Sequence, residues 1–151
     1  MSPLFKIVYL FSKVIEVINM SFSRVFSSRE GEYFKIYSNG NYKCKGYYRN
    51  GLKTDYWLSY YESGTKKNEG KYIEGKKEGK WIYYHPNGMI EDIELNKNGK
   101  VDGEFQSFYI NGIMSAVGRY VNGKREGIFK IFNDKGEQID EIEFINGERT
   151  K

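Results

Sequence analysis

Residues 79–88 read Gly-Lys-Trp-Ile-Tyr-Tyr-His-Pro-Asn-Gly, and this stretch decides the fold. Its centre consists of aromatic and β-branched residues, which favour strands because they pack well on a pleated, half-buried surface. It ends on an Asn-Gly pair, which favours a hairpin because both residues tolerate the positive φ of a type I′ turn. The stretch therefore predicts a β-strand that runs into a hairpin turn.

The pattern of this stretch recurs along the chain at a step of 24 residues. The turn glycine keeps the step at Gly40, Gly64, Gly88, Gly112 and Gly136. The strand aromatic keeps it at Tyr33, Trp57, Trp81, Phe105 and Phe129, and three residues later stand Ile36, Tyr60, Tyr84, Phe108 and Phe132. Further glycines keep it at Gly51, Gly75, Gly99, Gly123 and Gly147, and at Gly31, Gly79, Gly103 and Gly127, with Asp55 in the remaining slot. Several series in phase indicate a tandem repeat.

A unit of this length has room for two short strands and two turns, with little left for a helix. Asn-Gly pairs at 39–40, 50–51, 98–99, 111–112, 122–123 and 146–147 predict turns of the type I′ class. We therefore predict an all-β fold, an elongated antiparallel sheet of about five tandem 24-residue β-hairpins. The expected units lie near 31–54, 55–78, 79–102, 103–126 and 127–151, so the repeat domain covers 29–151.

Because side chains alternate along a strand, the aromatic series that begins with Tyr33 and Trp57 is expected on one face of the sheet, together with Tyr37, Tyr61 and Tyr109. The series that begins with Ile36 and Tyr60 is expected on the opposite face. Gly46, Gly70 and Gly118 fall in second strands, where a missing side chain lets a ring lie across the backbone. The third unit departs from the pattern, because Asn96 stands where other units have Tyr48, Tyr72, Tyr120 and Phe144. A bulge that shifts this strand by one residue is the simplest expectation.

Residues 1–28 lie outside the repeat and predict an N-terminal helix. The stretch from Leu4 to Ile18 is apolar except for Lys6, Lys13 and Glu16, which makes it a poor fit to a membrane span or a secretory signal. Three interpretations stay open: a helix that caps the first hairpin, an amphipathic helix that binds a membrane or a partner, and a degenerate signal or anchor.

Charge and composition limit the classes of function. The formal net charge is +4, too small to indicate nucleic-acid binding, and the single Cys44 permits no intrachain disulfide. Residues 31–54 alone carry five basic side chains against Glu32, so the N-terminal end is the basic one. Candidates for contact with an anionic lipid or an acidic partner are Lys6, Lys13, Lys43, Lys45, Arg49 and Lys53.

Catalytic patterns are weak. His85 is the one histidine and takes a repeat position that elsewhere holds Tyr37, Tyr61, Tyr109 or Asn133, so it fills a structural slot. The stretch 70–77 resembles a phosphate-binding loop but has Lys77 after Lys76 and no following helix pattern. We expect no enzyme activity, no cofactor and no metal site.

The repeat resembles the bacterial variant of the MORN family, the membrane occupation and recognition nexus. The resemblance is carried by 79–84, Gly-Lys-Trp-Ile-Tyr-Tyr, and by 72–79, Tyr-Ile-Glu-Gly-Lys-Lys-Glu-Gly, and it extends over about 31–147. Proteins of this kind are labelled YwqK-type antitoxins of toxin–antitoxin systems, so the resemblance implies binding to a partner protein. Other family members bind phospholipid or act as membrane scaffolds. The similarity to repeats of phosphatidylinositol-phosphate kinases does not extend to any kinase signature here.

The preferred expectation is a bacterial protein-interaction module that is cytoplasmic, with a peripheral position on the inner membrane face as the alternative. Tyr-rich surfaces suit protein contacts because the ring supplies contact area at small entropic cost. Candidate contact residues are Tyr37, Tyr61, Tyr83, His85 and Tyr109. From sequence, replacing Tyr61 and Tyr109 by alanine should weaken binding and leave the melting curve nearly unchanged.

Overall fold

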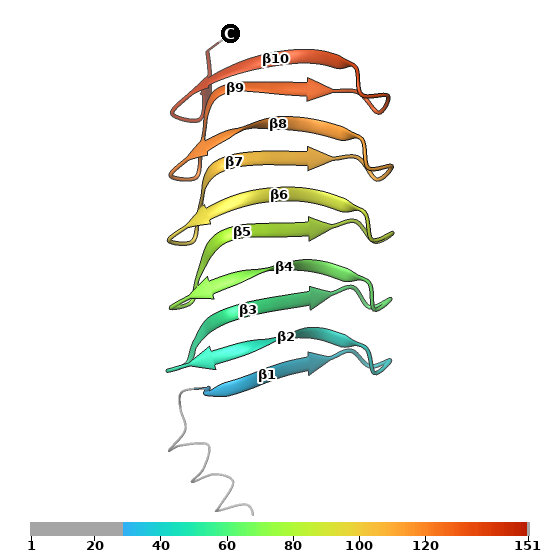
Figure 1. Cartoon of the computed structure of the whole chain (residues 1–151), viewed down its shortest axis with the longest axis vertical. Coiled ribbons are helices and arrows are strands. Elements are labelled where there is room, and N and C mark those ends of the chain that lie inside the picture. Colours follow the sequence, from blue (N-terminus) through green and yellow to red (C-terminus); the bar gives the residue numbers. More distant parts are fainter. Residues whose placement is uncertain (1–28, 151) are drawn as a thin grey trace, which may run out of the picture.

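A computed structural model describes residues 29–150, which form one open antiparallel sheet with the strands in chain order (Figure 1). The all-β prediction is confirmed for this part of the chain, which contains strands and turns and no helix. The predicted N-terminal helix, with Lys6 and Lys13, lies outside the described residues. The strands are β1 Gly31–Ile36, β2 Tyr42–Arg49, β3 Leu52–Tyr60, β4 Lys66–Ile73, β5 Lys76–Tyr84, β6 Ile90–Lys97, β7 Lys100–Phe108, β8 Met114–Val121, β9 Lys124–Phe132, β10 Gln138–Ile145 and β11 Glu148–Arg149.

The hairpins stack along the longest axis, and their turns lie on two opposite sides of the sheet (Figure 1). On one side the turn has two residues with positive φ, as a type I′ turn requires: for example, Asn50 has φ 52° and Gly51 has φ 76°. The others of this kind are Glu74-Gly75, Asn98-Gly99, Asn122-Gly123 and Asn146-Gly147. The type I′ prediction is right on this side.

On the other side the turns are longer, and the type I′ prediction is wrong there. Only the glycine has positive φ, as at Gly40 with φ 88°. The Tyr37 amide donates to the Asn41 carbonyl at 2.8 Å, and the Gly40 amide donates to the Tyr37 carbonyl at 3.1 Å. Asn39 acts through its side chain, whose Oδ1 accepts from the Asn41 amide at 3.0 Å. The two kinds of Asn-Gly turn therefore differ in loop length, not in residue type.

In three of the hairpins the ring of the predicted aromatic series, Trp57, Trp81 or Phe129, lies across the backbone of the preceding strand. A Cβ built on Gly70 would lie 2.3 Å from Cδ2 of Trp81, and the equivalent distance from Gly46 to Trp57 is also 2.3 Å. Trp81 is 2% exposed, and its Nε1 donates to the Lys71 carbonyl at 3.1 Å. The predicted role of the second-strand glycines is confirmed: only glycine leaves room for the buried ring.

Strands β3, β5, β7 and β9 each carry a β-bulge near the residue of the ring series, opposite the preceding strand. Lys45 pairs with Leu58 and Tyr47 pairs with Thr54, so three residues of β3 lie opposite the single Gly46. A β-bulge of this kind increases local bend and twist. Asp55, in the slot that is otherwise glycine, has φ 57°, a left-handed conformation that aspartate tolerates better than most residues.

The third hairpin keeps the common register, so the predicted one-residue shift is wrong. Asn96 pairs with Gly79, and the residues 24 positions earlier, Tyr72 and Asp55, pair in the same way. The bulge near Tyr84 also has an equivalent near Tyr60 in the preceding hairpin. Asn96 is instead a buried polar residue, 5% exposed, whose amide donates to Glu94 at 3.0 Å. Glu94 replaces the second-strand glycine, so Phe105 of the next strand cannot lie across the backbone and stays half-buried.

Candidate functional site

The two faces of the sheet differ in how strictly they repeat. We name the face that carries Tyr33, Trp57, Trp81, Phe105 and Phe129 the ring face. We name the opposite face the variable face. On the first strand of each hairpin, the residue that directly follows the ring lies on this face: Phe34, Leu58, Ile82, Gln106 and Lys130. The ring face holds similar rings in every hairpin, which is the behaviour of a scaffold. The variable face also keeps one large apolar residue per hairpin, in the series Ile36, Tyr60, Tyr84, Phe108 and Phe132. Its other positions, such as those of Phe34 and Tyr56, differ from hairpin to hairpin, and recognition can reside there.

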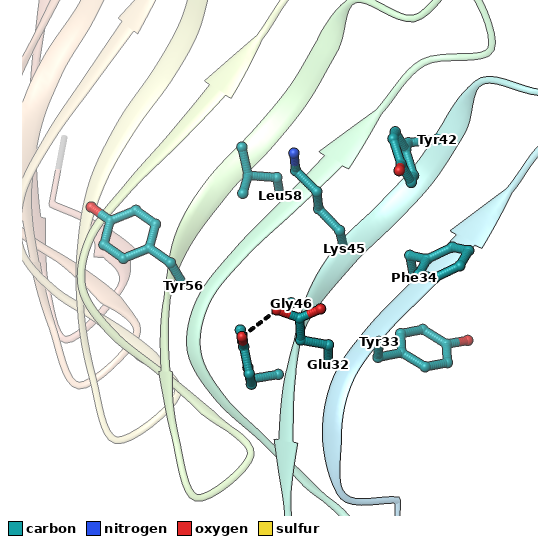
Figure 2. Close-up of a pocket in the computed structure, with 9 residues that line it drawn as sticks. Glu32, Tyr33, Phe34, Tyr42, Lys45, Gly46, Tyr56 and Leu58 are labelled. Carbon is teal, nitrogen blue, oxygen red and sulfur yellow. Dashed lines mark hydrogen bonds between the residues drawn. The ribbon is translucent and has the colours of Figure 1, made fainter.

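The variable face has a hollow of about 300 Å³ over β1, β2 and β3 (Figure 2). Figure 2 shows side chains from three neighbouring strands around it, so its shape is set by sheet geometry and not by a loop. Its lining consists mainly of aromatic and aliphatic groups with one acid and one base: Glu32, Tyr33, Phe34, Tyr42, Lys45, Gly46, Tyr47, Tyr56 and Leu58.

The rings of this hollow are unusually open to solvent. Phe34 is 63% exposed, Tyr56 61%, Tyr42 48% and Tyr47 43%. Phe34 and Tyr42 meet edge to face with ring centroids 5.9 Å apart, so the rings support one another without being covered. Exposed apolar surface gathered in one place is typical of an interaction site.

The two charged residues of the hollow each contact tyrosine side chains. Lys45 Nζ lies 5.5 Å from the Tyr42 ring centroid and 5.8 Å from that of Tyr60, within cation–π range. The Tyr47 hydroxyl donates to Glu32 at 2.5 Å, and this hydrogen bond raises the pKa of Tyr47 above its ordinary value. The site thus offers an apolar floor, an ammonium group beside the rings and tyrosine hydroxyls, which suit binding.

Four of the five predicted contact tyrosine or histidine positions have a structural role. Each is half-buried and donates to a backbone carbonyl of the next hairpin. The bonds are Tyr37 to Tyr60 at 2.9 Å, Tyr61 to Tyr84 at 2.7 Å, His85 to Phe108 at 2.8 Å and Tyr109 to Phe132 at 2.8 Å. We name this series the clasp row. Its bonds give a physical reason for Tyr61→Ala with Tyr109→Ala to lower stability, against the expectation from sequence.

Tyr83, the fifth candidate, belongs to a polar cluster on the ring face. Its hydroxyl donates to Glu94 at 2.7 Å and accepts from Lys77. Burial and the bond to Glu94 raise the pKa of Tyr83 far above its ordinary value. Lys77 also lies 4.6 Å from the Trp81 ring centroid. The cluster fills the place where Glu94 and Asn96 interrupt the row of rings.

The basic residues predicted for an acidic partner do not form one patch. Lys45 lies in the hollow of the variable face, whereas Lys53 lies over Trp57 at 4.3 Å, on the ring face. Lys43 is a bulged residue that contacts the Tyr37 ring at 5.3 Å, and Arg49 is exposed beside the Asn50 turn. Of this set, the structure brings Lys45 to the hollow.

Sequence reasoning missed Phe34, Tyr42, Tyr47 and Tyr56 as site residues. A signal was available, because the repeat position of Tyr56 holds Glu32, Lys80, Glu104 and Ile128 in the other units. Larger differences between units mark these residues, whereas the predicted contact row of Tyr37, Tyr61, His85 and Tyr109 differs only modestly between units.

The histidine and the cysteine of the chain lie outside the hollow. His85 is bonded to the Phe108 carbonyl, and Cys44 is a half-buried thiol on β2. Over residues 29–150, no group of three or more His, Cys, Asp and Glu side chains is placed to hold a metal ion. In the same part of the chain, no helix is long and apolar enough to cross a membrane.

Comparisons with known proteins give no assignment: no family model matches the sequence, and a search of curated proteins finds no significant match.

Proposed function

We propose that this chain is a non-enzymatic protein-interaction module made of about five MORN-type hairpin repeats, and that the variable-face hollow binds the partner. The observation that carries the proposal is the group of four exposed aromatic residues, Phe34, Tyr42, Tyr47 and Tyr56, on the neighbouring strands β1 to β3. Aromatic anchors on rigid elements supply much of the binding energy in protein interfaces. Lys45 and the Tyr47–Glu32 pair add charge and hydrogen-bonding groups beside these rings, as a binding surface requires.

The hollow also favours a partner chemistry. Lys45 adds a positive charge beside the rings, and residues 31–54 carry a net charge of +4. A partner segment with an apolar side chain for the hollow and a nearby carboxylate for Lys45 would satisfy both features. A toxin of a bacterial toxin–antitoxin pair, bound in the cytoplasm, is the identity that the MORN resemblance implies for such a partner.

A matched pair of substitutions tests this proposal. Phe34→Ala with Tyr56→Ala removes two exposed rings of the hollow. Ile128→Ala removes a side chain that is 52% exposed at the repeat position of Tyr56 in the last hairpin. We expect the first variant to weaken affinity for the partner by about 10- to 100-fold, as hot-spot truncation does, and the second to leave it unchanged. Equal affinities, measured by calorimetry on variants with native melting curves, would sink the proposal.

A second candidate is a peripheral scaffold on anionic phospholipid, with residues 1–28 and the basic first hairpin facing the membrane. The observation that favours it is the same +4 charge of residues 31–54, since basic groups gain about 1 kcal/mol each near an anionic leaflet. Co-sedimentation with phosphatidylserine vesicles and with neutral phosphatidylcholine vesicles separates the two candidates. A preference for the anionic vesicles that disappears on deletion of residues 1–28 would favour the membrane.

A further inference from the structure

A second hollow lies on the variable face, over β5, β6 and β7. Its volume is about 210 Å³, and the residues that line it are Lys80, Ile93, Leu95, Glu104 and Gln106. Each of these stands two repeat units after a residue that lines the first hollow. The second hollow is therefore the same site of the repeat, with Ile93 and Leu95 as its apolar floor in place of the rings.

One row of exposed residues crosses the sheet from the first hollow to the second, with one residue on each strand from β2 to β7. We name it the crossing row, and its members are Tyr47, Tyr56, Lys71, Lys80, Leu95 and Glu104. Tyr56 pairs with Lys71, and Lys80 pairs with Leu95. The tyrosines line the first hollow, and the last three members line the second. The two hollows are thus parts of one continuous surface.

Two like charges lie side by side in the middle of the crossing row, because Lys71 and Lys80 stand on neighbouring strands. Gly70 pairs with Trp81 and Lys71 pairs with Glu78, so Lys80 lies in the bulge beside Lys71. Among residues 29–150, neither ammonium group forms an ion pair with a carboxylate. Like charges that face each other across strands destabilise the pairing, and a bound anion would relieve this repulsion.

The acidic neighbours of these lysines are engaged elsewhere. Glu69, two residues before Lys71 on the same strand, accepts hydrogen bonds from Lys66 at 3.0 Å and from Tyr84. The carboxylate of Glu78 accepts from the Asn98 amide at 2.9 Å. The positive charge of the crossing row is therefore free to meet an external carboxylate.

The other hairpin interfaces that the structure describes do not repeat this pair of like charges. Their equivalent positions hold Tyr47 with Tyr56, Leu95 with Glu104, and Arg119 with Ile128. The lysine pair thus occurs at the one interface that separates the two hollows.

We infer that both hollows bind a single segment of the partner protein, which crosses the strands and places a carboxylate over Lys71 and Lys80 between two apolar side chains. This inference rests on the proposed function, because it extends the same binding site. Three strand steps separate Tyr56 from Leu95, about 14 Å at about 4.7–4.9 Å per step. An extended chain covers that distance in about four residues at about 3.3 Å each.

Strand geometry then sets the order of residues in the partner segment. Side chains of an extended chain alternate, so the first, third and fifth residues of a five-residue segment face the sheet. With the first residue at Tyr56 and the fifth at Leu95, the third lies midway, between Lys71 and Lys80. The segment therefore has apolar residues at its first and fifth positions and an acidic residue at its third.

Peptide titrations of the full chain, followed by the NMR shifts of its isotope-labelled amides, test the inference. The probe is the blocked peptide Phe-Ser-Asp-Ser-Leu, and its isosteric control is Phe-Ser-Asn-Ser-Leu, which lacks the charge. We expect the aspartate peptide to bind about 3- to 10-fold more tightly in about 0.02 M salt, the range of two exposed ion pairs. This advantage should vanish in about 1 M salt, where the Debye length is about 3 Å. Equal affinities in low salt, or no shift with either peptide, would overturn the inference.

Variants of the chain separate this inference from the proposed function. Lys71→Ser with Lys80→Ser should make the two peptides bind equally. The matched control, Lys76→Ser with Lys100→Ser, removes two exposed lysines outside the crossing row and should leave the difference between the peptides unchanged. Tyr56→Ala should weaken the binding of both peptides.

The outcomes distinguish the two levels of the account. Peptides that bind the native chain equally and both lose affinity in Tyr56→Ala would overturn the inference and leave the proposed function standing. Binding that Tyr56→Ala does not change would contradict both. Tighter binding of thymidylyl-thymidine, which carries the same single negative charge, would overturn the assignment to a protein segment. The peptide comparison on the native chain decides the question if a variant does not fold.

Discussion

Gly70→Ala is the substitution that most directly challenges the packing of the rings. The new Cβ would lie 2.3 Å from Cδ2 and 2.4 Å from Cε2 of Trp81, far inside the 3.5–4.0 Å contact distance of carbon atoms. Both atoms belong to the indole ring, which is 2% exposed and donates to the Lys71 carbonyl at 3.1 Å. The ring must therefore move by more than about 1 Å or leave its site.

Two limits bracket the cost of this substitution. Full expulsion of the indole exposes about 200 Å² of ring, worth about 5 kcal/mol at about 25 cal/mol per Å². If the indole is only displaced, the overpacked site costs about 1–3 kcal/mol of stability. Alanine offsets up to about 1 kcal/mol of this cost, because its unfolded chain has less conformational entropy to lose than that of glycine. We expect a loss of about 2–4 kcal/mol in the free energy of unfolding.

Urea denaturation followed by tryptophan fluorescence measures this loss, since both tryptophans, Trp57 and Trp81, lie in these neighbouring hairpins. The control is Ile142→Ala, which places the same methyl group at the equivalent position of the last hairpin, where no following strand within the described chain brings a ring over it. We expect the control to cost about 1 kcal/mol, the burial of a half-exposed side chain. A Gly70→Ala midpoint equal to the native one would refute the account of why these glycines are needed.

Three further predictions concern the clasp row, the polar cluster and pH. Tyr109→Phe keeps the ring but removes the bond to the Phe132 carbonyl, so a thermal melt should show a loss of about 0.5–1.5 kcal/mol; no loss would mean the clasp row contributes nothing. Glu94→Ala leaves Tyr83 and Asn96 without their acceptor and should cost about 1–3 kcal/mol in urea, whereas Glu94→Gln should cost less; equal costs would contradict the role of the acceptor. Burial and the hydrogen bond to Glu69 raise the pKa of Tyr84 from 10.0 to about 12. Its stabilising contribution is therefore complete below about pH 10 and is lost as the pH rises through about 12, so alkaline unfolding should be shallower in Tyr84→Phe than in the native chain. Burial alone would raise the pKa of Glu69, but hydrogen bonds from Tyr84 and Lys66 outweigh it, so the pKa is lowered. The contribution of Glu69 to the free energy of unfolding is therefore lost as the pH falls through that lowered pKa.

The strands and the ring face could be predicted from sequence because local residue types determine them. A turn such as Asn50-Gly51 carries its own conformation, and Gly70 and Trp81 recur in phase with their equivalents. The identical Asn39-Gly40 pair gives a different turn because the loop is longer, and loop length follows from strand pairing that no local pattern contains.

The side-chain contacts between hairpins were not predictable in the same way. Tyr61 reaches a carbonyl 23 residues further on, which requires the spacing of stacked hairpins and cannot be read from the tyrosine itself. Asn96 was misinterpreted because a polar residue in a ring position suggests a shifted strand, whereas Glu94 supplies the acceptor that lets it be buried in register. The hollow was missed because Phe34 and Tyr56 are singular in the repeat, and the candidates were sought in a row of rings that recurs from unit to unit, such as Tyr61 and Tyr109.

Photo-crosslinking in cells tests the central claim, that the variable-face hollow binds the partner, most directly. A photoreactive phenylalanine analogue at position 56 lies in the hollow, and the same analogue at position 128 lies at the equivalent repeat position at the far end of the sheet. We predict one dominant protein adduct from position 56 that Phe34→Ala abolishes, and no such adduct from position 128. The same adduct from both positions, or adducts from position 128 alone, would contradict the claim.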